Sequence, residues 1–161
     1  MGDELSPVLA LLDEVHESLA TSRDQNAYKL GRMGQNNIVI AGMPSIGNNA
    51  TAMVITQLLN DFHQIRFGLL VGIGGGIPDE DYDDEDLNDI RLGDVAVSDS
   101  HGAFGGVIQF DGGKSTIDGF IQTGHQSKPP HVLAANVKTL KAAHNLYGNS
   151  ISRYLDDMMK K

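Results

Sequence analysis

The sequence has no cysteine and no tryptophan, and it contains few basic residues. The missing cysteine excludes disulfide frameworks, zinc–thiolate sites and thiol catalysis. No stretch approaches the ~18 consecutive apolar residues of a membrane span. The start Met1-Gly2-Asp3-Glu4 also lacks the basic residues of a signal peptide. These absences predict a cytoplasmic protein that binds no membrane.

The charge balance argues against a nucleic-acid partner. The chain has 12 basic and 21 acidic residues, a net charge of −9, with no basic footprint. Eight of the acids lie within residues 79–89, and the rest of the chain is nearly neutral. Because this run lacks the central glycine and spaced acids of a calcium-binding loop, we expect 79–89 to be an exposed acidic loop.

The composition is that of a globular protein, and the hydrophobic periodicity predicts the α/β class. The 161 residues, 40% apolar and 20% charged, fit a single domain over 1–161. Apolar residues at three- and four-residue spacing predict a helix over 4–19. Two strands, 27–33 and 37–42, flank a hairpin turn, and a helix over 50–62 precedes a buried strand over 65–73. This strand–helix–strand order predicts parallel pairing.

The second half of the chain adds shorter elements. We expect strands at 94–98 and 104–110, a polar, glycine-rich connection over 111–130, and helices over 132–147 and 150–159.

Two glycine-bearing loops follow predicted parallel strands, at the sheet edge where ligands bind in open α/β folds. One contains Gly47, and the other is Gly72-Ile73-Gly74-Gly75-Gly76. Glycine lets a backbone approach a ligand closely, although such runs also simply turn the chain. Neither loop fits the dinucleotide fingerprint, and Gly113-Lys114-Ser115 lacks the first glycine of a Walker loop.

Five motifs follow one another over nearly the whole chain: Tyr28-Lys29-Leu30-Gly31-Arg32-Met33, Ile46-Gly47-Asn48-Asn49-Ala50-Thr51-Ala52, Arg66-Phe67-Gly68-Leu69-Leu70-Val71-Gly72-Ile73-Gly74-Gly75-Gly76-Ile77-Pro78, Asp89-Ile90-Arg91-Leu92-Gly93-Asp94-Val95 and Phe104-Gly105-Gly106-Val107-Ile108-Gln109-Phe110. Together they resemble the purine and uridine phosphorylase superfamily, which includes the methylthioadenosine/S-adenosylhomocysteine nucleosidases. The most similar branch looks fungal, where such domains often stand in receptor-like proteins with NACHT, ankyrin or TPR regions. The resemblance implies part of a three-layer fold with a mixed, mostly parallel sheet flanked by helices.

The resemblance also implies cleavage of an N-glycosidic bond in a purine or other nucleoside. Glu4 matches the carboxylate that orients the attacking water, a role that suits a proton acceptor, although an acid in a first helical turn is also favoured by the helix dipole. The substrate-binding positions implied are Ile46, Gly47, Asn48, Gly72, Ile73, Gly74, Gly75 and Gly76.

At several positions the sequence departs from the family pattern, and these departures change which reaction the resemblance implies. Leu70 and Ile73 stand where phosphate-using members place an arginine and a serine, so the resemblance favours hydrolysis over phosphorolysis, with phosphate left open as a co-substrate. No other cofactor is expected, and the six histidines show no paired spacing for a metal. The family's ribose-binding and general-acid motifs have no match after His131, and its first strand has none before the first helix.

The chain therefore looks shortened at both ends, and we expect little or no catalysis from it. The alternative is a non-catalytic module of a receptor-like protein that senses a ligand or docks a partner. We expect a nucleoside or related small molecule as ligand. We also expect either a homo-oligomer or membership of a larger multidomain protein.

Overall fold

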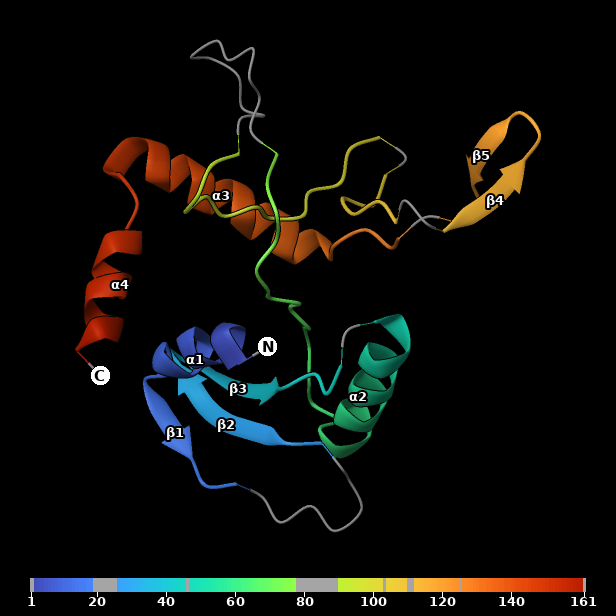
Figure 1. Ribbon diagram of the computed structural model, residues 1–161. Coiled ribbons are helices and arrows are strands. Elements are labelled where there is room, and N and C mark those ends of the chain that lie inside the picture. Colours follow the sequence, from blue (N-terminus) through green and yellow to red (C-terminus); the bar gives the residue numbers. More distant parts are fainter. Residues whose placement is uncertain are drawn as a thin grey trace. The chain divides into compact units, whose positions relative to one another are not determined.

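The structure, a computed structural model, describes residues 2–18, 26–45, 47–77, 90–102, 104–109, 112–124 and 126–160 (Figure 1). The chain divides into two compact units. Unit 1 comprises Met1–Gly74 and Ile151–Lys161, and unit 2 comprises Gly75–Ser150. The single domain over 1–161 stays a prediction, and the acidic loop 79–89 lies outside the described residues.

Unit 1 is built on a three-stranded antiparallel sheet in the order β1-β2-β3. A two-residue turn joins β2 to β3, with Met33 opposite Asn36. Gly34 takes φ +57° in this turn, a conformation that favours glycine. Its N–H donates to Oδ2 of Asp13 over 2.6 Å, so a carboxylate outside the hairpin fixes the turn. The elements of the unit are α1 (Gly2–Ala10), β1 (Glu14–His16), β2 (Tyr28–Met33), β3 (Asn36–Ala41), α2 (Asn48–Asp61) and α4 (Ile151–Met159).

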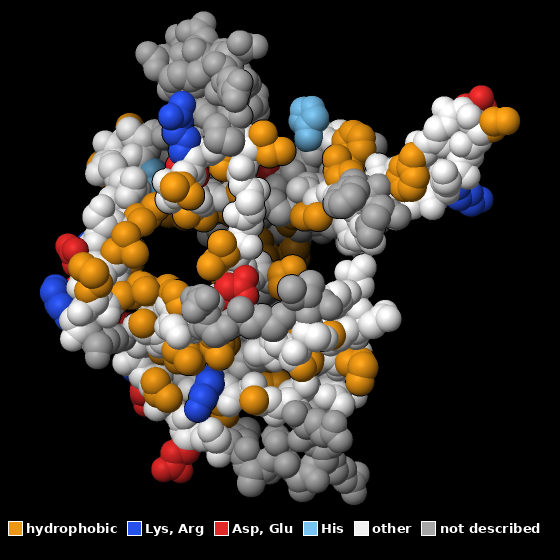
Figure 2. Space-filling model, in the orientation of Figure 1, with side chains coloured by type: hydrophobic (Ala, Val, Ile, Leu, Met, Phe, Trp, Pro, Cys, Tyr) orange, Lys and Arg blue, Asp and Glu red, His pale blue; other side chains and the backbone are white. Residues whose placement is uncertain are grey.

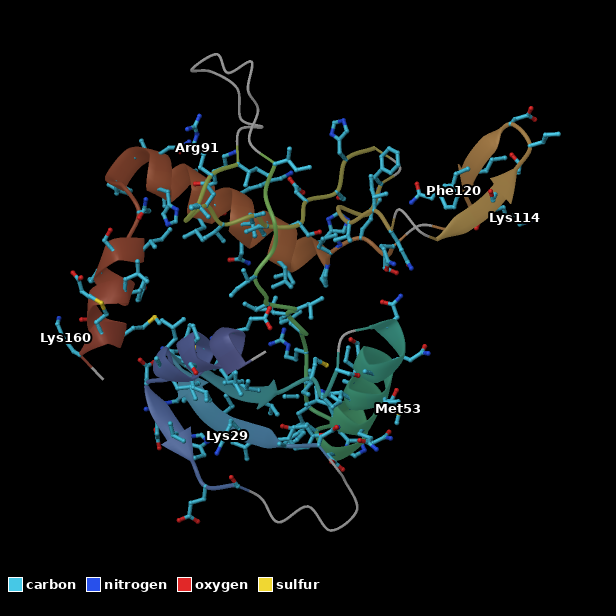
Figure 3. All side chains as sticks on the ribbon, viewed as in Figure 1. Lys29, Met53, Arg91, Lys114, Phe120 and Lys160 are labelled. Atoms are coloured by element: carbon cyan, nitrogen blue, oxygen red, sulfur yellow. The ribbon has the colours of Figure 1, made fainter. Side chains whose placement is uncertain are left out.

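Helix α2 is held to the start of β2 by one aromatic pair and one amide. The rings of Tyr28 and Phe62 meet edge to face, 5.3 Å between centroids and 88° between planes. Nδ2 of Asn26 donates to the Tyr28 hydroxyl at 3.0 Å and to the carbonyl of Val54 at 3.4 Å. Val54 is the buried residue of this helix, whereas Met53 is exposed (Figure 3). One face of α2 thus contacts the unit, and the other is solvated.

Unit 2 contains a long helix and a small exposed hairpin. Helix α3 (His131–Tyr147) has no buried residue. Strands β4 (Gly113–Thr116) and β5 (Gly119–Gln122) pair in an antiparallel hairpin that is exposed on both faces (Figure 3). The ring of Phe120 lies directly over Gly113.

The buried core of the described chain is very small. Only Leu12 and Val54 are buried among its apolar residues, each 2% exposed, and apolar side chains reach the surface widely (Figure 2). The chain exposes 13763 Å². A folded domain of this size exposes about 7800 Å², and two separate units of half the mass together expose roughly 9400 Å². The chain therefore exposes more surface than two compact units of this mass would.

The prediction of a three-layer fold with a mostly parallel sheet is wrong. Both sheets are antiparallel, and the described part of 65–77 contains no strand or helix. The tight hairpin turn fixes β2 and β3 as antiparallel. Glycine weakens a strand because it costs backbone entropy and offers no side chain to pack. Two glycines, Gly68 and Gly72, interrupt the expected strand 65–73, and three more, Gly74, Gly75 and Gly76, follow it directly.

Of the other predicted helices and strands, some are confirmed and some are wrong. The hairpin over 27–42 and the later three helices are confirmed with small shifts at their ends. The helix over 4–19 is wrong beyond Ala10, because the N–H of Asp13 donates to the Arg32 carbonyl at 2.9 Å and starts a strand. The described residues of the expected strands 94–98 and 104–110 form no strand. The hairpin of β4 and β5 occupies what the sequence predicted to be a plain connection.

Candidate functional site

Two parts of the predicted site meet in unit 1, although 69 residues separate them in the sequence. The backbone N–H of Ile73 donates to Oε1 of Glu4 at 3.0 Å. A side chain on Gly72 would start 3.0 Å from the same oxygen, so the carboxylate lies against the glycine loop. A carboxylate beside freely approachable backbone can orient a small polar molecule and accept a proton from it.

The second predicted loop lines a separate hollow at the start of α2. This open hollow of about 410 Å³ is lined by Ser45, Gly47, Asn48, Asn49 and Ala50. Gly47 takes φ 126° and caps the helix without a side-chain hydrogen bond. Its carbonyl accepts from both the N–H and the hydroxyl of Thr51, at 3.2 and 3.0 Å. The described contacts of Gly47 and Asn48 do not reach Glu4 or Ile73.

The remaining predicted positions are dispersed. Ile46 lies outside the described residues. Gly74 and Gly75 have open space where a side chain would stand, and the division between the two units falls between them. Gly76 packs against Ile90, whose Cγ2 lies 2.8 Å from the position a Cβ would take. The five positions of the glycine loop are therefore divided between the two units.

The feature that sequence reasoning missed is the exposure of the segment before the glycine loop. Leu69, Leu70, Val71 and Ile73 are 64 to 87% exposed, where a covered strand was expected. No hydrogen bond involves residues 67–72 within the described chain. The glycine density was the signal that could have shown this.

Two classes of site find no support in the described ranges. No group of three His, Asp or Glu side chains there is arranged to hold a metal ion. None of the helices described combines the length and the apolar character that a bilayer span requires.

Comparison with known proteins found a relative that is a much longer fungal protein. The chain is 42% identical over 156 residues to a protein of Hyaloscypha variabilis described as a "Nucleotide-binding leucine-rich repeat (NLR)-like protein". The chain is similar to a segment of a fungal NLR-like protein. The alignment covers 96% of this chain but only 15% of the NLR-like relative. The expected likeness to part of a larger fungal protein is confirmed.

The comparisons supply no narrower assignment. No family model matches the chain, and no solved structure matches it. The resemblance to nucleoside phosphorylases and nucleosidases therefore stays a prediction.

Proposed function

We propose that this chain is a non-catalytic docking module of a receptor-like protein of the NLR kind. The observation that carries the proposal is the exposed apolar segment of unit 1, from Phe67 to Ile73. Among the apolar residues that the structure describes, only Leu12 and Val54 are buried. Large exposed apolar patches mark surfaces that proteins cover with a partner. The similarity to a segment of a much longer NLR-like protein supplies the context in which such a surface has a use.

The geometry of the predicted site supports docking over catalysis. Catalytic sites bury most of the substrate in a concave, largely apolar pocket and hold reacting groups in fixed positions. The hollow at Ser45–Ala50 is open, and the Glu4–Ile73 contact lies apart from it. The described residues thus offer a polar contact and a shallow depression, without the enclosure that excludes water.

A second function, nucleoside binding with hydrolysis, is favoured by one observation. Glu4 and the Gly72–Ile73 loop were expected to share a site, and they contact each other. In this function the Glu4 carboxylate accepts a proton from the attacking water as the bond to the sugar breaks. Leu70 and Ile73 offer no charged side chain that could bind phosphate. Hydrolysis is therefore favoured over phosphorolysis in this second function.

Incubation of the purified chain with nucleosides separates these functions. Adenosine, inosine, uridine and methylthioadenosine are supplied with and without phosphate, and free base is measured by chromatography. The docking proposal predicts no base release and no rise in melting temperature with any nucleoside. A native-state ligand would raise that temperature by mass action.

Glu4→Gln is the matched variant in this assay. The glutamine carbonyl can still accept the hydrogen bond from the N–H of Ile73, but it is no base. Base release by the parent chain that Glu4→Gln abolishes would establish hydrolysis and overturn the non-catalytic proposal. A raised melting temperature without base release would replace docking by ligand sensing.

A further inference from the structure

Strand β3 has an open hydrogen-bonding edge. It is the last strand of its sheet, paired on one side with β2 and on the other with no strand among the described residues. In an antiparallel pair, alternate residues turn their N–H and C=O groups away from the neighbour. The described hydrogen bonds of Asn36–Ala41 are confined to the ladder with β2. The outer edge of β3 is therefore ready to accept a further strand.

The same unit also contains a segment that could serve as the added strand, Gly68–Ile73, which we call the donor segment; the edge of β3 is its acceptor. Like β3 it is six residues long, and neither stretch contains a charge or a proline. The N–H of Ile73 donates to Glu4, while residues 68–72 make no hydrogen bond within the described chain. Leu69, Leu70 and Val71 are all well exposed. A short, uncharged, apolar stretch with unpaired backbone groups is the type of segment that adds to a sheet edge.

We propose that two copies of this chain exchange these segments, each placing Gly68–Ile73 as a fourth strand against β3 of the other. A second copy is the partner that the observations select, because unit 1 holds both this segment and, in β3, an uncharged edge of the same length, whereas the other edge strand, β1, has only three residues. A two-fold pair uses the segment and the β3 edge of each copy, which gives a closed dimer. The inference rests on the proposed docking function and names its partner.

A two-fold exchange makes the same strand contact twice, which doubles the area that a single contact would bury. Stable interfaces bury about 800 Å² on each partner. Each copy would contribute the exposed side chains of Leu69, Leu70, Val71 and Ile73 as donor, and the edge and one face of β3 as acceptor. Neither stretch carries the lysine or proline with which natural edge strands prevent such pairing.

Sedimentation equilibrium from micromolar to submillimolar concentration tests the exchange on the full chain. We expect a reversible dimer. Leu70→Lys should raise the dimer Kd by roughly a hundredfold, because each dimer would bury the charge twice. Leu70 is 87% exposed, so the variant should fold as the parent does. Ile117→Lys is the matched control, since Ile117 is fully exposed on the β4–β5 turn and should leave the Kd unchanged.

Cross-linking through introduced cysteines locates the contact. Because the chain has no natural cysteine, only the introduced ones can react. Asn37→Cys protein is mixed with Leu70→Cys protein and treated with a short bismaleimide, so any cross-link between the two variants joins two chains. We expect this pair to cross-link far faster than Asn37→Cys with Ile117→Cys. A monomer at all concentrations, a dimer indifferent to Leu70→Lys, or equal cross-linking of both pairs would overturn the exchange.

Failure of the exchange and failure of the proposed function are distinguishable. A monomeric chain without base release refutes the exchange and leaves the non-catalytic proposal standing. A dimer that also releases base refutes the proposed function while the strand contact remains.

Discussion

At the scale of single residues, close packing concentrates around β2 in unit 1. Gly31 is buried there, opposite Val15 and Ile38. A Cβ at Gly31 would lie 2.5 Å from the carbonyl oxygen of Glu14 and 2.7 Å from Cδ1 of Leu12. This role could not be predicted from the sequence, because the residues that crowd Gly31 come from a segment predicted to be helical. The motif around Gly31 suggested only a strand.

Gly31→Ala should lower the free energy of unfolding by about 1–3 kcal/mol, the usual cost of overpacking. The crowding oxygen belongs to the backbone of β1 and cannot move without disturbing the ladder to β2. Urea unfolding followed by circular dichroism measures the change. Gly42→Ala is the control, since it has open space at the same atom and should change stability by less than about 0.5 kcal/mol. Equal midpoints for both variants would contradict this packing.

The same question, of what could be predicted from the sequence, applies to the residues of the candidate site. The family resemblance places Glu4 and Ile73 in one site but does not specify the hydrogen bond between them that the structure shows. The separation of Gly74 from Gly75 by a unit boundary was not, because nothing in a glycine run states which side of it packs with which element.

At the scale of elements, local signals predicted the structure well and long-range pairing was predicted poorly. The β2–β3 hairpin follows from a turn that its own residues specify, and α2 and α3 follow from their periodicity. A parallel strand at 65–73 required partners distant in sequence. Its glycines and the antiparallel hairpin before it left the apolar run without one. The apolar character of residues 65–73 therefore predicted a buried strand, but the segment has no partner strand and stays exposed.

The seating of α2 on the sheet depends on the edge-to-face pair of Tyr28 and Phe62. Phe62→Ala removes that pair and some buried area, so it should destabilise unit 1 by about 1–2 kcal/mol. Phe120→Ala is the matched control, because Phe120 is half exposed on the hairpin of unit 2. Thermal unfolding followed at a helix-sensitive wavelength measures both. A Phe62→Ala variant as stable as Phe120→Ala would show that the ring pair does not secure α2.

At the scale of the whole molecule, the large exposed surface supports the proposed docking function. The chain exposes 13763 Å², well above the roughly 9400 Å² expected even for two separate units. Composition alone predicted an ordinary core, since 40% of the residues are apolar. Composition counts apolar residues but does not say whether their neighbours cover them. The likeness to a segment of a long NLR-like protein agrees with the proposed docking surface.

Hydrogen–deuterium exchange in dilute, monomeric protein tests the central claim most directly, which is that the apolar segment Gly68–Ile73 stands open for docking. The amides of Leu69, Leu70 and Val71 should exchange at rates near those of an unstructured peptide, while those of β2 exchange slowly, because only the latter are paired in a ladder. Protection of Leu69–Val71 equal to that of β2 in the monomer would show that the segment is already covered. That result would contradict the docking account.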